Sequence, residues 1–193
     1  MDKKERGRKA GNIILAIGIV FFVIACVLVI DVHINQNKAA AESEAALKQL
    51  QQMIPDIDAG DSGINGDTSG PLSVFDYKGS SYIGILSVPD RKLSWPVEDE
   101  NGSGEKVPAC TGGSPYKDSF EISGPDFKGV FADLKKLKEG DKVVFTDVYG
   151  NKTEYTVDST VQMPKKATSK TALTITARKP MADVYMVSCV KAK

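Results

Sequence analysis

The feature that most constrains this chain is a run of twenty residues without a charge, GNIILAIGIVFFVIACVLVI, at positions 11–30. In helical conformation twenty residues extend about 30 Å, the hydrocarbon thickness of a bilayer. A cleaved secretory signal is the alternative, but its apolar core is usually only about 7–15 residues long. The length of the run therefore favours an uncleaved transmembrane anchor through residues 11–30.

The flanking residues predict the orientation and the domain boundaries. Residues 1–10 hold several lysines and arginines, so the positive-inside rule makes them a cytoplasmic tail and puts residues 31–193 outside. The chain is thus expected to be a single-pass protein of the cell membrane. Residues 31–72 combine a predicted helix at 36–54 with a glycine-rich, flexible linker at 56–71, and together they form a stalk. The remaining domain is expected over residues 73–193.

The domain over residues 73–193 is predicted to be mainly β. Short runs rich in β-branched and aromatic residues indicate strands at 81–88, 92–97, 171–177 and 183–190, and residues 141–161 indicate a hairpin. Residues 130–138 predict a single helix, because Phe131, Leu134 and Leu137 recur at a spacing of three. Many short strands and one crossover helix predict a closed β-barrel.

Composition excludes several functional classes. The 25 basic residues balance the 25 acidic ones, so no nucleic acid is expected as a partner. The three cysteines form no CxxC pair, and His33 is the only histidine. The sequence therefore predicts neither a metal site nor a cofactor.

Three blocks of the domain together resemble the sortase family. They are YIGILSVPDRKLSWPV, the segment from Gly124 through LKKLKEGDKVVFTD, and the LTIT strand that precedes the last strand. The resemblance implies a closed barrel on the surface of a Gram-positive bacterium. Sortases cleave the sorting signal of another protein and pass the acyl group to an amine. The family chemistry uses a cysteine thiolate, a histidine acid and base, and an arginine that stabilises the oxyanion.

All three positions that match the family's catalytic residues are changed in this chain. The histidine position is Pro125, the cysteine position is Arg178 and the arginine position is Tyr185. Proline cannot transfer a proton, and a guanidinium is not a nucleophile. His33 directly follows the predicted anchor and does not replace the missing histidine. The substitutions predict a pseudoenzyme with no intact catalytic residue.

The substituted site offers two interpretations. Arg178 and Lys179, with Tyr185 as an aromatic platform, are candidates for holding a carboxylate or carbonyl of a bound peptide without cleaving it. The alternative is a solvated basic strand end and a tyrosine that faces the core. Cys189 and Cys110 are the alternative nucleophiles. In the ordinary interpretation Cys189 is a small buried side chain, and Cys110 is packed in a turn-rich loop.

Three functions follow from these alternatives. The first is a non-catalytic module that binds or regulates, with a sorting-signal peptide, a surface or pilin protein, or an active sortase as its partner. The second is an active cysteine transpeptidase that uses Cys189 or Cys110. The third is a relic without selected activity. The sequence favours the first.

Overall fold

The computed structural model describes residues 3–54, 70–117, 119–163, 171–179 and 184–192. The linker predicted over residues 56–71 lies almost entirely outside these ranges. The described chain divides into two compact units, residues 1–37 and 38–193. The domain boundaries expected from the sequence stay a prediction.

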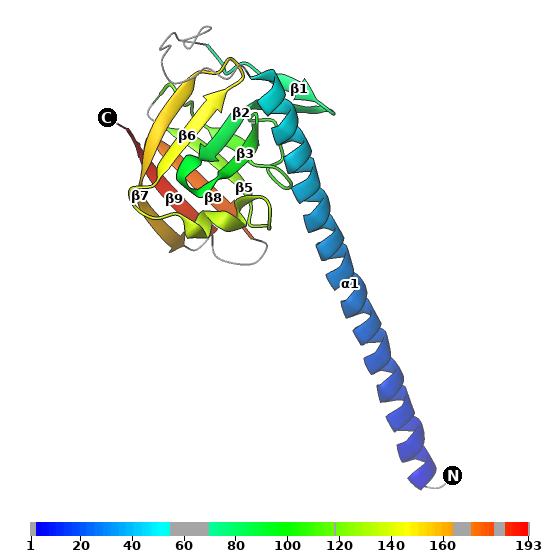
Figure 1. The fold of residues 1–193 in the computed structure, drawn as a ribbon. Helices are drawn as coiled ribbons and strands as arrows, with labels where there is room; N and C mark the ends of the chain where they lie inside the picture. Colours follow the sequence, from blue (N-terminus) through cyan, green and yellow to red (C-terminus); the bar gives the residue numbers. More distant parts are fainter. Residues whose placement is uncertain (1–2, 55–69, 118, 164–170, 180–183, 193) are drawn as a thin grey trace. The chain divides into compact units, whose positions relative to one another are not determined.

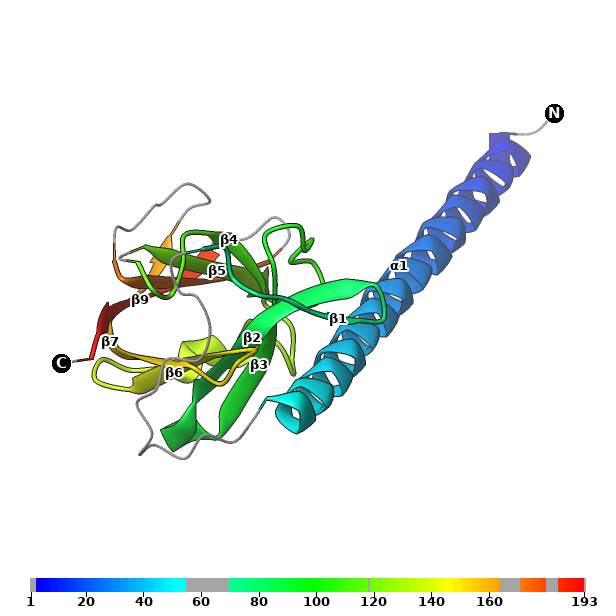
Figure 2. The same cartoon turned by 90° about the horizontal axis from the view of Figure 1, so that it is seen from above.

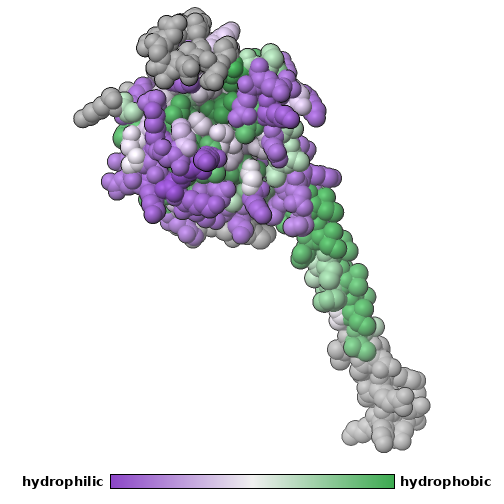
Figure 3. Space-filling model, in the orientation of Figure 1, coloured by the Kyte–Doolittle hydropathy of each residue, from purple (hydrophilic) through white to green (hydrophobic). Residues whose placement is uncertain are grey.

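The N-terminal element is one continuous helix, α1 (Lys3–Met53). Its apolar side chains between Leu15 and Ile34 are exposed, and Figure 3 shows them as a hydrophobic surface along the helix. A window of 18 residues within α1 has a mean hydropathy of 3.0, and none of it is buried. The helix is therefore long and apolar enough to cross a membrane. The helix predicted over residues 36–54 is the C-terminal part of α1.

Nine strands of the described residues form one sheet that closes on itself (Figure 1). The order is β1-β2-β3-β4-β5-β8-β9-β7-β6, and an additional pairing of β2 with β6 closes eight of the strands into a barrel. The predicted mainly β, closed barrel is thereby confirmed. The strands are β1 (Phe75–Tyr77), β2 (Ser80–Val88), β3 (Leu93–Glu98), β4 (Ala109–Gly112), β5 (Phe120–Pro125), β6 (Lys142–Asp147), β7 (Lys152–Met163), β8 (Leu173–Arg178) and β9 (Val184–Lys191).

Closure of the barrel depends on a glycine. Gly84 on β2 lies opposite Asp147 on β6, and a Cβ built on Gly84 would lie 2.1 Å from the Thr146 carbonyl oxygen. Any side chain there would push β6 away from β2. The barrel interior is filled by large apolar side chains that are essentially unexposed: Phe120, Phe131, Phe145, Tyr155, Leu86, Ile122, Leu134, Leu173 and Ile175.

The crossover helix differs from the prediction. The segment forms a short 3-10 helix, η2 (Phe131–Lys136), in place of a helix over residues 130–138. A 3-10 helix has three residues per turn, so the spacing of three between Phe131 and Leu134 places both on its buried face. The Phe131 ring meets the Trp95 ring edge to face, with 5.2 Å between centroids. The spacing of three therefore predicted the buried face correctly, but the segment is a short 3-10 helix and not the longer helix that was expected.

Three strands were not predicted from the sequence. β1 and β4 have only three and four residues, and β5 ends in Gly124 and Pro125, which disfavour strand structure locally. One consequence concerns Cys110, which was expected in a turn-rich loop and lies in β4. Cys110 pairs with Ile122 on β5, and this pairing holds it in the strand. A local sequence pattern does not reveal such a neighbour.

The part of α1 after residue 38 packs on the outside of the barrel (Figure 2). Ala46 and Leu50 of the helix form a second apolar cluster with Tyr82, Ile85 and Val107. The cluster attaches the last turns of α1 to β2 and to the segment between β3 and β4.

An ion pair fastens the turn after β2 to the start of β6. The short 3-10 helix η1 (Pro89–Arg91) links β2 to β3, and Arg91 donates two hydrogen bonds to Asp141, from Nε at 2.6 Å and from Nη2 at 3.1 Å. The Lys138 backbone N–H also donates to Asp141, at 2.8 Å. The Arg91 bond is the main reason why the pKa of Asp141 lies below its ordinary value.

We expect Asp141→Asn to lower the free energy of unfolding by about 1–2 kcal/mol at neutral pH, because a bidentate charge-assisted pair is lost. A depressed pKa means that this contribution is present above the unfolded-state value of about 3.9 and is lost as the pH falls through the folded-state value. The difference between the natural chain and the variant should therefore shrink below about pH 4.

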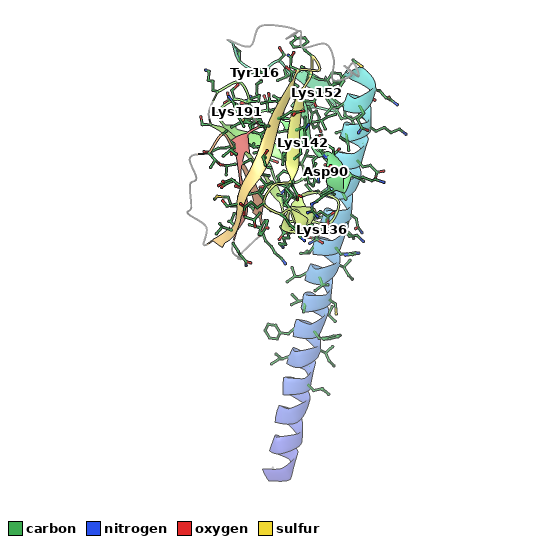
Figure 4. All side chains as sticks on the ribbon, turned by 60° about the vertical axis from the view of Figure 1, so that its left-hand side comes forward. Asp90, Tyr116, Lys136, Lys142, Lys152 and Lys191 are labelled. Carbon is green, nitrogen blue, oxygen red and sulfur yellow. The ribbon has the colours of Figure 1, made fainter. Side chains whose placement is uncertain are left out.

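The measurement is urea denaturation of the full chain in detergent, followed by circular dichroism at neutral and acidic pH. Asp90→Asn is the matched control, since Asp90 is an exposed neighbour on η1 (Figure 4). Equal unfolding free energies for the two variants would show that the ion pair contributes nothing.

Candidate functional site

One end of the barrel holds the three positions that the sequence analysis matched to the family's catalytic residues. β5 and β8 run parallel, so their C-terminal ends share an edge, and β9 starts there because it runs antiparallel to β8. Pro125 lies directly opposite Arg178, and Tyr185 lies opposite Ala177. Residues that are sixty positions apart in the sequence are thus brought together. We call Pro125, Arg178 and Tyr185 the strand-end site.

Close packing fixes the turn at Pro125. A Cβ built on Gly124 would lie 3.0 Å from the Phe131 ring and 3.1 Å from the Pro108 Cα, so η2 packs directly against this backbone. The Asp126 N–H donates to the Arg178 carbonyl at 2.8 Å, which continues the pairing beyond β5. The Asp126 carboxylate, with 9% of its side chain exposed, accepts from Lys135 Nζ at 2.5 Å. The Asp126 carboxylate is therefore engaged in an ion pair.

The cations of the site face outward. Arg178 and Lys179 are both exposed, and neither forms a salt bridge with any carboxylate in the described part of the chain. The guanidinium extends toward the segment between β3 and β4, where a Cβ built on Gly104 would lie 2.9 Å from Arg178 Nη2. The site therefore presents fixed positive charge that an anionic group could approach.

Tyr185 is half-buried and packs against the main core. This placement agrees with the interpretation in which the ring contributes to packing.

Cys189 lies in the middle of the core. It is unexposed, and it pairs with Val157 on β7 and Leu173 on β8, at the end of β8 opposite to Arg178. Burial raises the pKa of the Cys189 thiol to about 12. A thiol of that pKa stays protonated near neutral pH and is a poor nucleophile.

Cys110 is also buried, with 6% of its surface exposed. It borders a cavity of about 420 Å³ that is also lined by Leu72, Ile83 and Lys117. The Cys110 thiol donates to the Gly112 carbonyl at 3.6 Å, and burial raises its pKa. Cys26, Cys110 and Cys189 are all unpaired. Neither buried thiol lies beside the strand-end site.

Sequence reasoning missed the contribution of the segment between β3 and β4. Gly104, with a φ of +62°, lies in this segment against the Arg178 guanidinium. Its signal was the short motif NGSG at 101–104, which predicts a tight turn but not what the turn contacts. Chemically, the exposed Arg178 and Lys179 can bind an anion or a carbonyl oxygen.

Comparison with solved structures shows the same architecture in known proteins. Sortase C1 of GBS Pilus Island 1 is 15% identical, with a TM-score of 0.53 over 78% of this chain and 92% of that one. Sortase C of Streptococcus pneumoniae is 16% identical, with a TM-score of 0.52 over 79% and 89% of the two chains. Sortase A from Corynebacterium diphtheriae is 14% identical, with a TM-score of 0.51 over 82% and 84%. At these identities the likeness concerns the fold.

The family is shown by the sequence match. No curated protein matches the chain. The family model described as Sortase domain matches residues 86–193, more than half of the chain, and this range contains all three positions of the strand-end site. The resemblance inferred from the sequence is therefore confirmed, and this chain belongs to the sortase family.

Proposed function

We propose that this protein is a catalytically inactive sortase that binds a peptide or protein ligand at its strand-end site. The observation that carries the proposal is the pairing of Pro125 with Arg178 at the ends of β5 and β8. The backbone arrangement is intact, and the two side chains offer no base and no nucleophile. Function resides in such site residues and does not follow from the fold alone.

The charge of the site supports an anionic or carbonyl-bearing ligand. Arg178 and Lys179 are exposed and have no carboxylate partner among the described residues, so a ligand would not have to displace an internal ion pair. A guanidinium binds a carboxylate through two parallel hydrogen bonds. A sorting-signal peptide, a surface or pilin protein, or an active sortase would present such groups.

The proposed location is the outer face of the cell membrane of a Gram-positive bacterium. The support is the apolar stretch of α1, which is long enough to span a bilayer, together with the basic residues 1–10 that precede it. Residues 31–193 would then face the outside, where sorting signals are processed.

The competing function, an active transpeptidase that uses Cys189 or Cys110, gains no support from the geometry. Both thiols are buried, and burial raises the pKa of each. A thiolate at either position would also lack a neighbouring histidine, since His33 precedes the barrel in the sequence and is the only histidine. We therefore favour binding over catalysis.

The binding test uses the full chain in lipid nanodiscs and a fluorescent sorting-signal peptide with a free carboxylate. We expect saturable binding that weakens with salt, and Arg178→Gln should weaken it about tenfold, the value of one charge-assisted contact. Lys117→Gln removes an exposed charge elsewhere on the barrel and should leave the affinity unchanged. Equal affinity for both variants would refute the role of Arg178, and a cleaved peptide in the mass spectrum would refute inactivity.

A second test addresses the thiols. In the folded chain at pH 8, Cys110 and Cys189 should react with iodoacetamide far more slowly than in urea, since a pKa of about 12 leaves about one Cys189 thiol in ten thousand ionised. Peptide mapping by mass spectrometry would give the rate at each cysteine. Rapid alkylation of either cysteine in the folded chain, accompanied by loss of any peptide processing, would restore the enzymatic alternative.

A further inference from the structure

A cleft of about 520 Å³ lies on the outer wall of the barrel, apart from the strand-end site. Its lining comes from the C-terminal part of α1, the β1–β2 hairpin, the end of β3 and the segment between β3 and β4. The polar and aromatic residues of the lining are Glu42, Tyr77, Lys78, Ser80, Tyr82, Glu98, Ser103 and Lys106.

Glu98 forms the floor of the cleft and is held in a fixed position. Only 8% of the residue is exposed, and its carboxylate accepts hydrogen bonds from the Ser80 hydroxyl and the Gly104 N–H. The loop closes over it because residue 102 is a glycine: a Cβ there would lie 2.6 Å from Glu98 Oε2. A second cavity of about 300 Å³ also opens onto Glu98.

This buried carboxylate has no cation beside it. No lysine or arginine in the described part of the chain forms a salt bridge with Glu98. The charged groups that act on it are Asp99 and Glu42, both acidic, and these raise its pKa together with burial, which is the largest cause. Buried charges in proteins are normally paired, because an unpaired one loses the solvation of water without compensation.

The two lysines of the cleft are already engaged. Lys106 Nζ lies 3.1 Å from the Glu42 carboxylate, and Lys78 Nζ lies over the Tyr77 ring at 5.3 Å from its centroid. Among the charged side chains that line the cleft, only Glu98 has neither an ion pair nor a ring contact with the described part of the chain. A cationic ligand would therefore find an open partner in its carboxylate.

The ligand chemistry can be narrowed further. In the described part of the chain, no group of three histidine, cysteine or acidic side chains could hold a metal ion. The aromatic rings of Tyr77 and Tyr82 favour an organic cation, and Lys78 over Tyr77 shows that such a ring already attracts an ammonium group. Burial and the nearby Glu98 raise the pKa of Tyr82, so its hydroxyl keeps its proton and can donate a hydrogen bond.

We propose that this cleft binds a primary ammonium group, such as a lysine side chain of a partner peptide, through an ion pair with Glu98. The ammonium donates to the carboxylate oxygens that Ser80 and Gly104 leave unoccupied, because an ionised carboxylate can accept about four hydrogen bonds. The site is separate from the cations of the strand-end site and does not depend on the function proposed for them.

The test compares two probes on the full chain in lipid nanodiscs: Nα-acetyl-lysine methylamide and the same compound acetylated at Nε. Backbone NMR shifts report where each binds. We expect the lysine probe to cause saturable shifts around residues 80–82 and 98–107, and the acetylated probe to cause none. This comparison uses the natural chain, so it remains decisive even if a variant fails to fold.

Variants test whether Glu98 provides the negative charge that binds the lysine probe. Glu98→Gln has the same shape and should weaken binding of the lysine probe about tenfold or more, because a buried ion pair is lost. Glu105→Gln removes an exposed acid from the same segment and should leave binding unchanged. Thermal melting checks that both variants are folded. The proposal would be overturned if the two probes bound equally or if Glu98→Gln left binding of the lysine probe unchanged. It would also be overturned if the shifts centred on Arg178 or if no saturable shift appeared.

Discussion

Closure of the sheet between β2 and β6 is the constraint on which the rest of the structure depends. Gly84 permits it, because its missing side chain lets the Thr146 carbonyl approach the β2 backbone. A closed sheet has no free edge between these strands, and it encloses the aromatic core around Phe120 and Tyr155. Closure also fixes the parallel pair β5–β8, whose common end carries the strand-end site.

Backbone hydrogen bonds and close packing hold the strand-end site in place. Backbone hydrogen bonds, such as Asp126 N–H to the Arg178 carbonyl, hold the strand ends together whatever the side chains are. Packing of Phe131 against Gly124 supports the same turn from behind. Pro125 brings no titratable side chain to this end of the barrel, and Arg178 brings a charged guanidinium. The fold alone therefore does not establish the reaction.

The segment between β3 and β4 links two sites of opposite charge. Gly104 lies against the Arg178 guanidinium, while its N–H donates to the buried Glu98 carboxylate. The same segment is attached to α1 through Val107 in the apolar cluster and through the ion pair of Lys106 with Glu42. This arrangement gives the helix a structural role in the domain beyond the apolar stretch that precedes it.

The apolar helix, the long strands and the family could be predicted from the sequence, because each of these is carried by residue type and local spacing. The loss of the catalytic side chains stays a prediction. The sequence predicted the buried face of residues 131–137 but not the 3-10 geometry of η2, and it did not predict β1, β4 or β5. The folded structure was needed to show that Cys110 and Cys189 are buried, that Tyr185 packs on the core, and that Glu98 forms no salt bridge within the described residues. These properties depend on neighbours that are distant in the chain and are brought together only when the barrel closes.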